Sequence, residues 1–290
     1  MPLSVQIGLL LSLATALASI VGFLYKHRGA VDRPDVDWRR PLWSSLMLFR
    51  SRWYTIGVLV AMAGWGFHVG ALALAPISLV QATIAGGLVL LTVVADRFFG
   101  HQVSRREWIG VGMAAAGLAF LALTLDGGAD EAHSDYETAI LATFVPVVAA
   151  AGIAVAIAAR STRRAGVLFG ASAGLLWAAS DTTIKALSDE LGESGVAAIL
   201  INPMALAILT LSLAGMLVSA RSLQLGPAVP VIAVTSVAAN ATTIAAGPIV
   251  FAEPLPEDTL GLTVRMLAFC LVIVAAALTP PPLKAEAQLP

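Results

Sequence analysis

Nine long apolar segments, separated by short polar stretches, divide this chain of 290 residues. A helix needs about 20 apolar residues to cross a hydrocarbon core of about 30 Å, and each segment is close to that length. The segments are residues 4–24, 54–74, 77–98, 108–125, 138–158, 166–187, 196–220, 227–251 and 260–279. They are continuous, whereas the strands of a membrane barrel alternate apolar and polar residues over about 10 positions. The pattern predicts an all-α, polytopic membrane protein with nine transmembrane helices.

Composition agrees with this prediction and excludes several other classes of protein. The chain is 58% hydrophobic and 12% charged, whereas a soluble domain carries roughly 25% charged residues. Its single cysteine, Cys270, excludes an intramolecular disulfide and a cysteine-based metal site. The Arg residues are dispersed between apolar segments and form no basic stripe, so we expect no nucleic-acid partner.

The basic residues predict how the chain is oriented in the membrane. If the nine segments cross in turn, fifteen of the seventeen Lys and Arg residues fall on one side, and only Lys185 and Arg265 fall on the other. The fifteen are Lys26, Arg28, Arg33, Arg39, Arg40, Arg50, Arg52, Arg97, Arg105, Arg106, Arg160, Arg163, Arg164, Arg221 and Lys284. Because basic loops stay in the cytoplasm, we expect the N-terminus outside and the C-terminus in the cytoplasm. We therefore expect a multi-pass protein of the plasma membrane.

The longest cytoplasmic loop has a mixed basic and aromatic character. Trp38, Trp43 and Trp53 lie among its Arg residues, and its apolar stretch 42–49 fits the headgroup level of a bilayer. We interpret this loop as a surface anchor, with a regulatory or lipid-sensing role as the alternative.

The two halves of the chain share a weak pattern that predicts an inverted repeat. Residues 71–108 and 220–260 each contain a tight proline turn, a span that ends in an aromatic-small-polar triplet, a polar loop and the start of another span. The paired spans are five apart, so they run in opposite directions. We divide the chain into a first repeat with spans one to four (1–126), an acidic external loop (127–137), span five with its cytoplasmic loop (138–165), a second repeat with spans six to nine (166–280) and a cytoplasmic tail (281–290).

Short motifs in these repeats resemble a known superfamily. The segment 75–81, Ala-Pro-Ile-Ser-Leu-Val-Gln, resembles the EamA-like module of the drug/metabolite transporter superfamily. That module has a Gly-Glu pair before its last span. Ala252-Glu253 looks like this pair in the second half, whereas Gly100-His101 departs from it in the first.

Within that superfamily, the layout of nine spans with an outside N-terminus resembles the NIPA-type magnesium transporters most closely. Those proteins carry a Gly-Glu-x-x-Asn-Phe-x-Ala motif before the proline turn. At this place Trp65 replaces the carboxylate and His68 replaces the amide. The resemblance implies a transporter, and the missing carboxylate counts against magnesium as its substrate.

Ionisable residues within the spans are candidates for binding, because each costs roughly 2.5–3.5 kcal/mol to insert. Asp181 and Lys185 lie at positions i and i+4 of span six and therefore share a face. They form either a structural ion pair or a site in which Asp181 binds a cation or a proton. His68 can relay a proton, ligate a cation or serve in packing.

Other polar and aromatic residues extend this set. Trp65 and Trp177 lie deep in their spans, where they either line a cavity for an organic cation or fill the core. The Asn240 amide needs a partner outside its own helix, which is either a substrate or a neighbouring span. The complete set of binding candidates is Asp181, His68, Asn240, Trp65, Trp177, Lys185, Gln81 and Thr235. Asp181 is the expected metal contact if the substrate is Mg²⁺.

Glycines at helical spacing predict close helix packing. Gly166, Gly170 and Gly174 form a small-xxx-small ladder on span six, and Gly66 with Gly70 does so on span two.

These patterns favour a transporter over an enzyme. The sequence has no nucleotide-binding glycine loop, no His-Glu-x-x-His element and no recognisable nucleophile triad. We therefore expect no enzyme and no cofactor, and partners limited to the lipid bilayer and a small-molecule or cation substrate, with a homodimer left open. The first hypothesis is a secondary, alternating-access carrier of a small metabolite or drug-like solute. The alternatives are a NIPA-type transporter of Mg²⁺ or another divalent cation, and a non-transporting membrane assembly or lipid-handling partner.

Overall fold

A computed structural model gives the structure of the chain, and it describes residues 2–31, 33–34, 41–81, 83–84, 104–123, 135–200 and 202–278. Its helices are α1 (Leu3–Val31), α2 (Pro41–Leu48), α3 (Arg52–Leu74), α5 (Arg105–Leu123), α6 (Thr138–Ala159), α7 (Ala165–Leu200), α8 (Pro203–Leu225), α9 (Ala228–Val250) and α10 (Thr259–Leu278). The described residues contain no strand, so the all-α prediction is confirmed.

Six helices in the described part of the chain are long and apolar enough to cross a membrane. They are Leu3–Val31, Arg52–Leu74, Thr138–Ala159, Ala165–Ser188, Pro203–Leu225 and Pro230–Val250, and two shorter apolar helices cover Trp108–Gly117 and Thr259–Ala268. The predicted third span beyond residue 84, the Gly100-His101 pair, most of the acidic loop and the tail lie outside the described residues. Nine spans, the repeat and the orientation of the termini therefore stay predictions.

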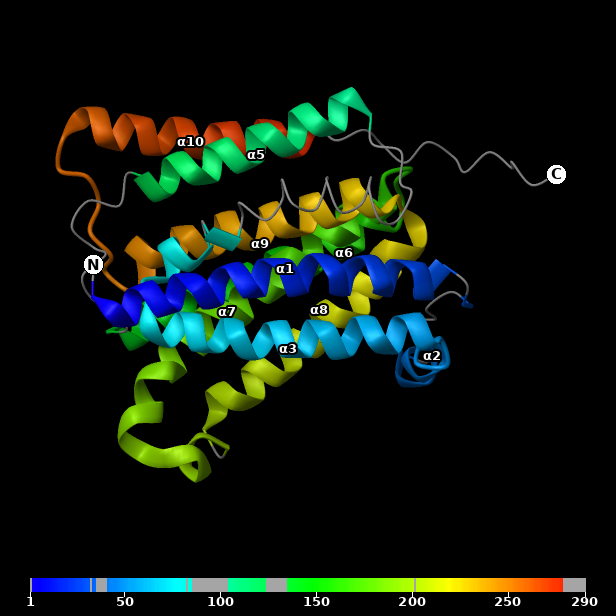
Figure 1. Cartoon of the computed structure of the whole chain (residues 1–290), viewed down its shortest axis with the longest axis horizontal. Helices are drawn as coiled ribbons and strands as arrows, with labels where there is room; N and C mark the ends of the chain where they lie inside the picture. The colour runs from blue at the N-terminus through cyan, green and yellow to red at the C-terminus, as the bar shows by residue number, and fades with distance from the viewer. Residues whose placement is uncertain are drawn as a thin grey trace.

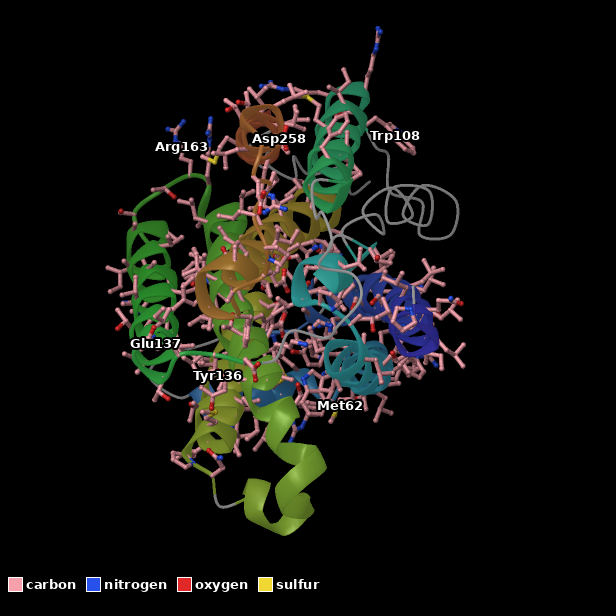
Figure 2. The ribbon with its side chains drawn as sticks, turned by 90° about the vertical axis from the view of Figure 1, so that its left-hand side faces the viewer. Met62, Trp108, Tyr136, Glu137, Arg163 and Asp258 are labelled. Carbon is pink, nitrogen blue, oxygen red and sulfur yellow. The ribbon has the colours of Figure 1, made fainter. Side chains whose placement is uncertain are left out.

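The helices lie side by side (Figure 1). α1 packs along α3, α7 packs against α6, α8 and α9, and α5 pairs with α10 along one flank. α6 lies at the edge of the molecule, with Glu137 at its start and Arg163 beyond its other end (Figure 2). Several of its large apolar side chains, among them Val147 and Ile157, are exposed, whereas Leu141 and Val148 are buried. Contacts between α3 and α7 bring segments from the two halves of the chain together.

One predicted boundary is wrong. We expected a span to begin at Val196, but residues 196–200 still belong to α7, and the next helix begins at Pro203. The side chain of Asn202 accepts a hydrogen bond from the Met204 backbone N–H at 2.9 Å. Asn as the capping residue followed by Pro in the first helical position is a strong start signal, and it outweighs the continuous apolar pattern.

Glycines set the closest helix contacts. A Cβ added to Gly174 would lie 2.9 Å from the Ala239 backbone nitrogen on α9, and one added to Gly166 would lie 2.7 Å from the Gly226 nitrogen. The predicted ladder on α7 is thus confirmed as a packing surface. The prediction for Gly66 is wrong, because a Cβ there would meet nothing within 4 Å.

The register of α3 explains the error at Gly66. The buried line of this helix runs through Tyr54, Gly57, Gly64, His68 and Ala71, at intervals of three, four or seven residues. A Cβ on Gly57 would lie 2.7 Å from the Gly22 carbonyl oxygen of α1. Gly66 lies two residues from Gly64 and from His68, about 200° around the helix, and therefore faces away from α1.

Candidate functional site

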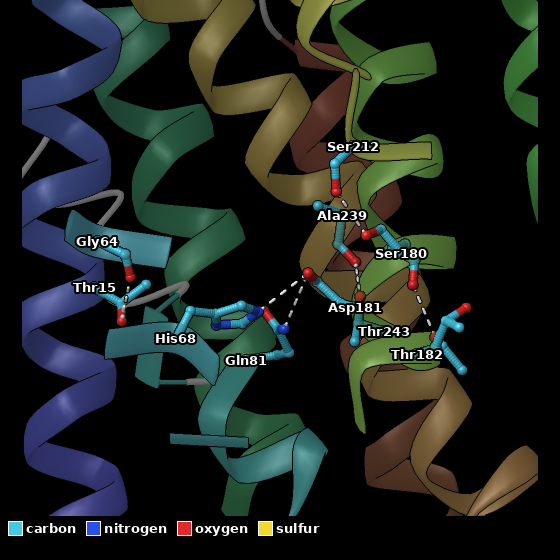
Figure 3. Close-up of polar contacts among 12 residues, drawn as sticks. Thr15, Gly64, His68, Gln81, Ser180, Asp181, Thr182, Ser212, Ala239 and Thr243 are labelled. Atoms are coloured by element: carbon cyan, nitrogen blue, oxygen red, sulfur yellow. Dashed lines mark hydrogen bonds and ion pairs between the residues drawn. The ribbon is translucent and has the colours of Figure 1, made fainter. Parts of the chain in front are cut away.

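The carboxylate of Asp181, on α7, meets two polar side chains from the first half of the chain (Figure 3). His68 Nε2 lies 3.2 Å from Asp181 Oδ1, and Gln81 Nε2 donates to Asp181 Oδ2 at 3.4 Å. The side chain of His68 is 8% exposed and that of Asp181 is 16% exposed. Each carboxylate oxygen thus has its own partner, and the group stays partly accessible.

A tight turn brings both His68 and Gln81 to this carboxylate. α3 ends at Leu74, and Ala75 adopts an extended conformation with φ −144° and ψ 159°. The helix restarts at Pro76, whose carbonyl accepts hydrogen bonds from the backbone N–H groups of Leu79 and Val80 at 3.1 and 3.0 Å. His68 therefore precedes the turn on the buried line of α3, and Gln81 follows the turn.

Lys185 is hydrogen-bonded to backbone carbonyl groups at the end of α3. Its Nζ donates to the carbonyl oxygens of Leu72 and Ala75, at 2.8 and 3.2 Å, and the side chain is fully buried. These carbonyls belong to the C-terminal end of α3, where unpaired oxygens and the helix dipole favour a cation. Lys185 thus contacts the end of α3, and Asp181, one turn earlier on α7, contacts His68 and Gln81.

Glu253 is a buried carboxylate that sequence reasoning did not place among the site residues. Its Oε1 accepts a hydrogen bond from the Ser78 backbone N–H at 3.4 Å, and its Oε2 is hydrogen-bonded to the Ser78 hydroxyl. The same hydroxyl lies 3.2 Å from the Ile244 carbonyl oxygen. The one sequence signal was the resemblance of Ala252-Glu253 to the Gly-Glu pair. Without that resemblance, a carboxylate directly after an apolar span is predicted to be a solvated loop residue.

Two candidates on α9 differ in how well they are satisfied. Thr235 donates to the Val231 carbonyl at 2.8 Å, within its own helix. Asn240 is 4% exposed, and within the described part of the chain its Nδ2 is buried without a hydrogen-bond partner. Both ring nitrogens of His68 are also buried without a hydrogen-bond partner among the described residues, although Nε2 lies 3.2 Å from Asp181 Oδ1. Since most buried polar atoms are paired, these two groups need an explanation.

The two tryptophans lie in separate surroundings. Trp65, three residues before His68 on α3, is 47% exposed. Trp177 lies with its ring centroid 5.6 Å from that of Phe23, and a Cβ on Gly215 would come within 2.7 Å of its Cδ1. The ammonium of Lys26 lies 4.0 Å from the Phe23 centroid and 5.8 Å from that of Trp177. Trp177 is therefore already engaged with an aromatic ring and a cation.

The chemistry at Asp181 suits weak binding of a hydrated cation better than a tight metal centre. No group of three or more His, Cys, Asp or Glu residues that could hold a metal ion occurs in the described ranges. Mg²⁺ usually keeps several waters and binds through one or two carboxylates. Asp181 supplies one carboxylate, and the Gln81 amide has a carbonyl oxygen that a rotation would present.

The chain is similar to one curated protein along most of its length. The match is the probable magnesium transporter NIPA9 of Arabidopsis thaliana. The two are 24% identical over 285 residues, which cover 92% of this chain and 80% of the plant protein. No protein-family model matches the chain. No solved structure matches it either. This similarity agrees with the resemblance of the short motifs to NIPA-type transporters. The aligned region includes both halves of the chain.

Proposed function

We propose that this protein moves a divalent cation, most simply Mg²⁺, across a membrane, with Asp181 as the cation-binding residue. The observation that carries the proposal is the placement of Asp181. It lies within the candidate span Ala165–Ser188, partly accessible, between an amide and an imidazole from the other half of the chain. An ionisable group in a span is costly, which favours a functional role. The similarity to a probable magnesium transporter supports the choice of cation.

The contacts suggest how the site alternates between a loaded and an empty form. In the structure His68 and Gln81 each occupy one carboxylate oxygen of Asp181. An entering cation takes the place of the Gln81 N–H, the Gln81 amide turns its oxygen toward the cation, and His68 keeps the carboxylate oriented. Asn240, on the helix α9 that packs against α7, is a further polar contact for the cation or its waters. Because the site joins α3 to α7, a rocking motion of the two halves would expose it to each side in turn.

A small metabolite or drug-like solute is the second candidate. Trp65 favours it, because this indole is 47% exposed three residues before His68 and can contact an organic cation. The engagement of Trp177 with Phe23 and Lys26 gives this candidate less support than two free tryptophans would.

The experiment is Mg²⁺ entry into proteoliposomes that contain the purified protein, read with an enclosed indicator dye. We expect entry with the wild type, loss of entry with Asp181→Asn and normal entry with Asp135→Asn, an exposed carboxylate outside the spans. Equal entry with Asp181→Asn would overturn the assignment of Asp181. No entry above empty liposomes, in folded protein, would overturn Mg²⁺ as the substrate.

In that second case, a screen for ligand-dependent thermal stabilisation decides between the remaining functions. Stabilisation by organic cations would identify the solute carrier. Absence of any stabilisation, together with tight co-purification of another membrane protein, would identify an assembly partner.

A further inference from the structure

The turn between α3 and residues 77–81 lies between two buried charges of opposite sign. The Lys185 ammonium donates to the carbonyls of Leu72 and Ala75 before the turn. The Glu253 carboxylate accepts from the Ser78 N–H after it. The end of a helix carries a partial negative charge and the start of a helix a partial positive charge. Each buried charge therefore matches the helix terminus that it contacts.

We propose that Lys185 and Glu253 are positioning residues that hold His68 and Gln81 against Asp181. This inference rests on the proposed function of the Asp181 site. Leu72 lies one helical turn after His68, and Ser78 lies one turn before Gln81. Lys185 itself lies one turn after Asp181 on α7. The two charges thus fix both arms of the turn relative to the carboxylate.

The distances at the site make it sensitive to such positioning. The Gln81–Asp181 hydrogen bond is long, at 3.4 Å, and His68 Nε2 lies 3.2 Å from the carboxylate without hydrogen-bond geometry. A shift of the turn by a fraction of an ångström is therefore enough to break the Gln81 hydrogen bond. In enzymes, a displacement of a positioned group by about 1 Å can lower the rate about a hundredfold.

The backbone around Glu253 is built to bring its carboxylate to Ser78. A Cβ on Gly247 of α9 would collide with Glu253 Oε2 and with the Ser78 hydroxyl, so glycine leaves room for both. Ala252 has φ 50°, a conformation that costs a non-glycine residue free energy. The Glu253 N–H donates to the Gly247 carbonyl at 3.2 Å and fixes the chain after that bend. Strain of this kind persists where the surrounding structure imposes it.

The test compares Mg²⁺ uptake kinetics of Lys185→Met and Glu253→Gln with matched exposed controls, Arg163→Met and Glu257→Gln. We expect each buried variant to raise the KM for Mg²⁺ about tenfold or more, with a smaller change in the maximal rate, because the binding geometry is lost. Lys185→Arg keeps a cationic donor and should restore most of the affinity. Unchanged KM values in folded Lys185→Met and Glu253→Gln would overturn the proposal.

A milder variant keeps the test decisive if a buried variant fails to fold. Ser78→Ala removes the hydroxyl but keeps the backbone N–H, and we expect an intermediate rise in KM. A wild-type KM in folded Ser78→Ala would then overturn the inference, because this change removes a contact that holds the turn.

A failure of the proposed function is distinguishable from a failure of this inference. If the wild type moves no Mg²⁺, hydrogen exchange of residues 72–81 in the intact protein still tests the positioning role, since it needs no substrate. We expect faster exchange of this segment in Ser78→Ala and Glu253→Gln, with α6 unchanged. Equal exchange in wild type and variants would overturn the inference.

Discussion

Glu253 lies against Ser78, 175 positions earlier in the chain, and accepts a hydrogen bond from its backbone N–H at 3.4 Å. The contact ties the segment after α9 to the first turn of the helix that carries Gln81. A local feature of one half of the chain, the start of a helix, is thereby completed by a side chain from the other half.

His68→Ala should weaken cation binding without abolishing transport. The change removes one of the two side chains that hold the Asp181 carboxylate and leaves Gln81 in place. A full hydrogen bond to a charged group contributes about 1.5–3 kcal/mol, and this contact lacks hydrogen-bond geometry, so we expect the KM for Mg²⁺ to rise by roughly tenfold at most. Proteoliposome uptake at graded Mg²⁺ concentrations measures it. A KM equal to that of the wild type would remove His68 from the site.

Lys185→Met should lower the stability of the fold as well as the affinity. The carbonyls of Leu72 and Ala75 would lose a buried donor, and an unsatisfied buried polar group costs about 1–3 kcal/mol. Thermal unfolding in detergent measures the loss, with Arg163→Met as the exposed control. A melting temperature unchanged from that of the wild type would show that the helix end is satisfied in another way.

Asn240→Leu should separate stability from function. Its Nδ2 is buried without a described partner, and removing such a group relieves a cost of about 1–3 kcal/mol. We therefore expect equal or higher thermal stability together with reduced Mg²⁺ uptake. A stable variant with full uptake would leave Asn240 outside the binding site, and a strongly destabilised one would mean that the amide is a packing contact.

Gly174→Ala and Gly66→Ala should have opposite effects. A Cβ at Gly174 would press on the α9 backbone, and overpacking of this kind costs about 1–3 kcal/mol. A Cβ at Gly66 meets open space, and alanine is favoured over glycine in a helix by up to about 1 kcal/mol. Unfolding of the two variants under identical conditions provides the comparison. Equal destabilisation by both would contradict the register assigned to α3.

The helical class, the ladder on α7 and the choice of Asp181 all followed from local properties of the sequence. Segment length predicts a helix because the hydrocarbon core has a known thickness. Glycine spacing predicts close packing, and it held at Gly174 because α9 approaches on that side. It failed at Gly66 because spacing does not say which face of α3 meets α1. Asp181 was selected because an ionisable residue in a span is costly.

The partners of the charged residues were decided by tertiary structure alone. The i, i+4 spacing of Asp181 and Lys185 shows only that they share a face of α7. The Lys185 ammonium contacts the end of α3 because the packing of α3 against α7 brings unpaired carbonyl groups close to the ammonium. From the sequence alone, Glu253 is predicted to be a solvated loop residue. Only the tertiary structure brings its carboxylate to Ser78, in the turn that follows α3. Sequence determines which groups must be satisfied, whereas the packing of distant segments determines which atoms satisfy them, because hydrogen bonds depend on distances that local periodicity does not contain.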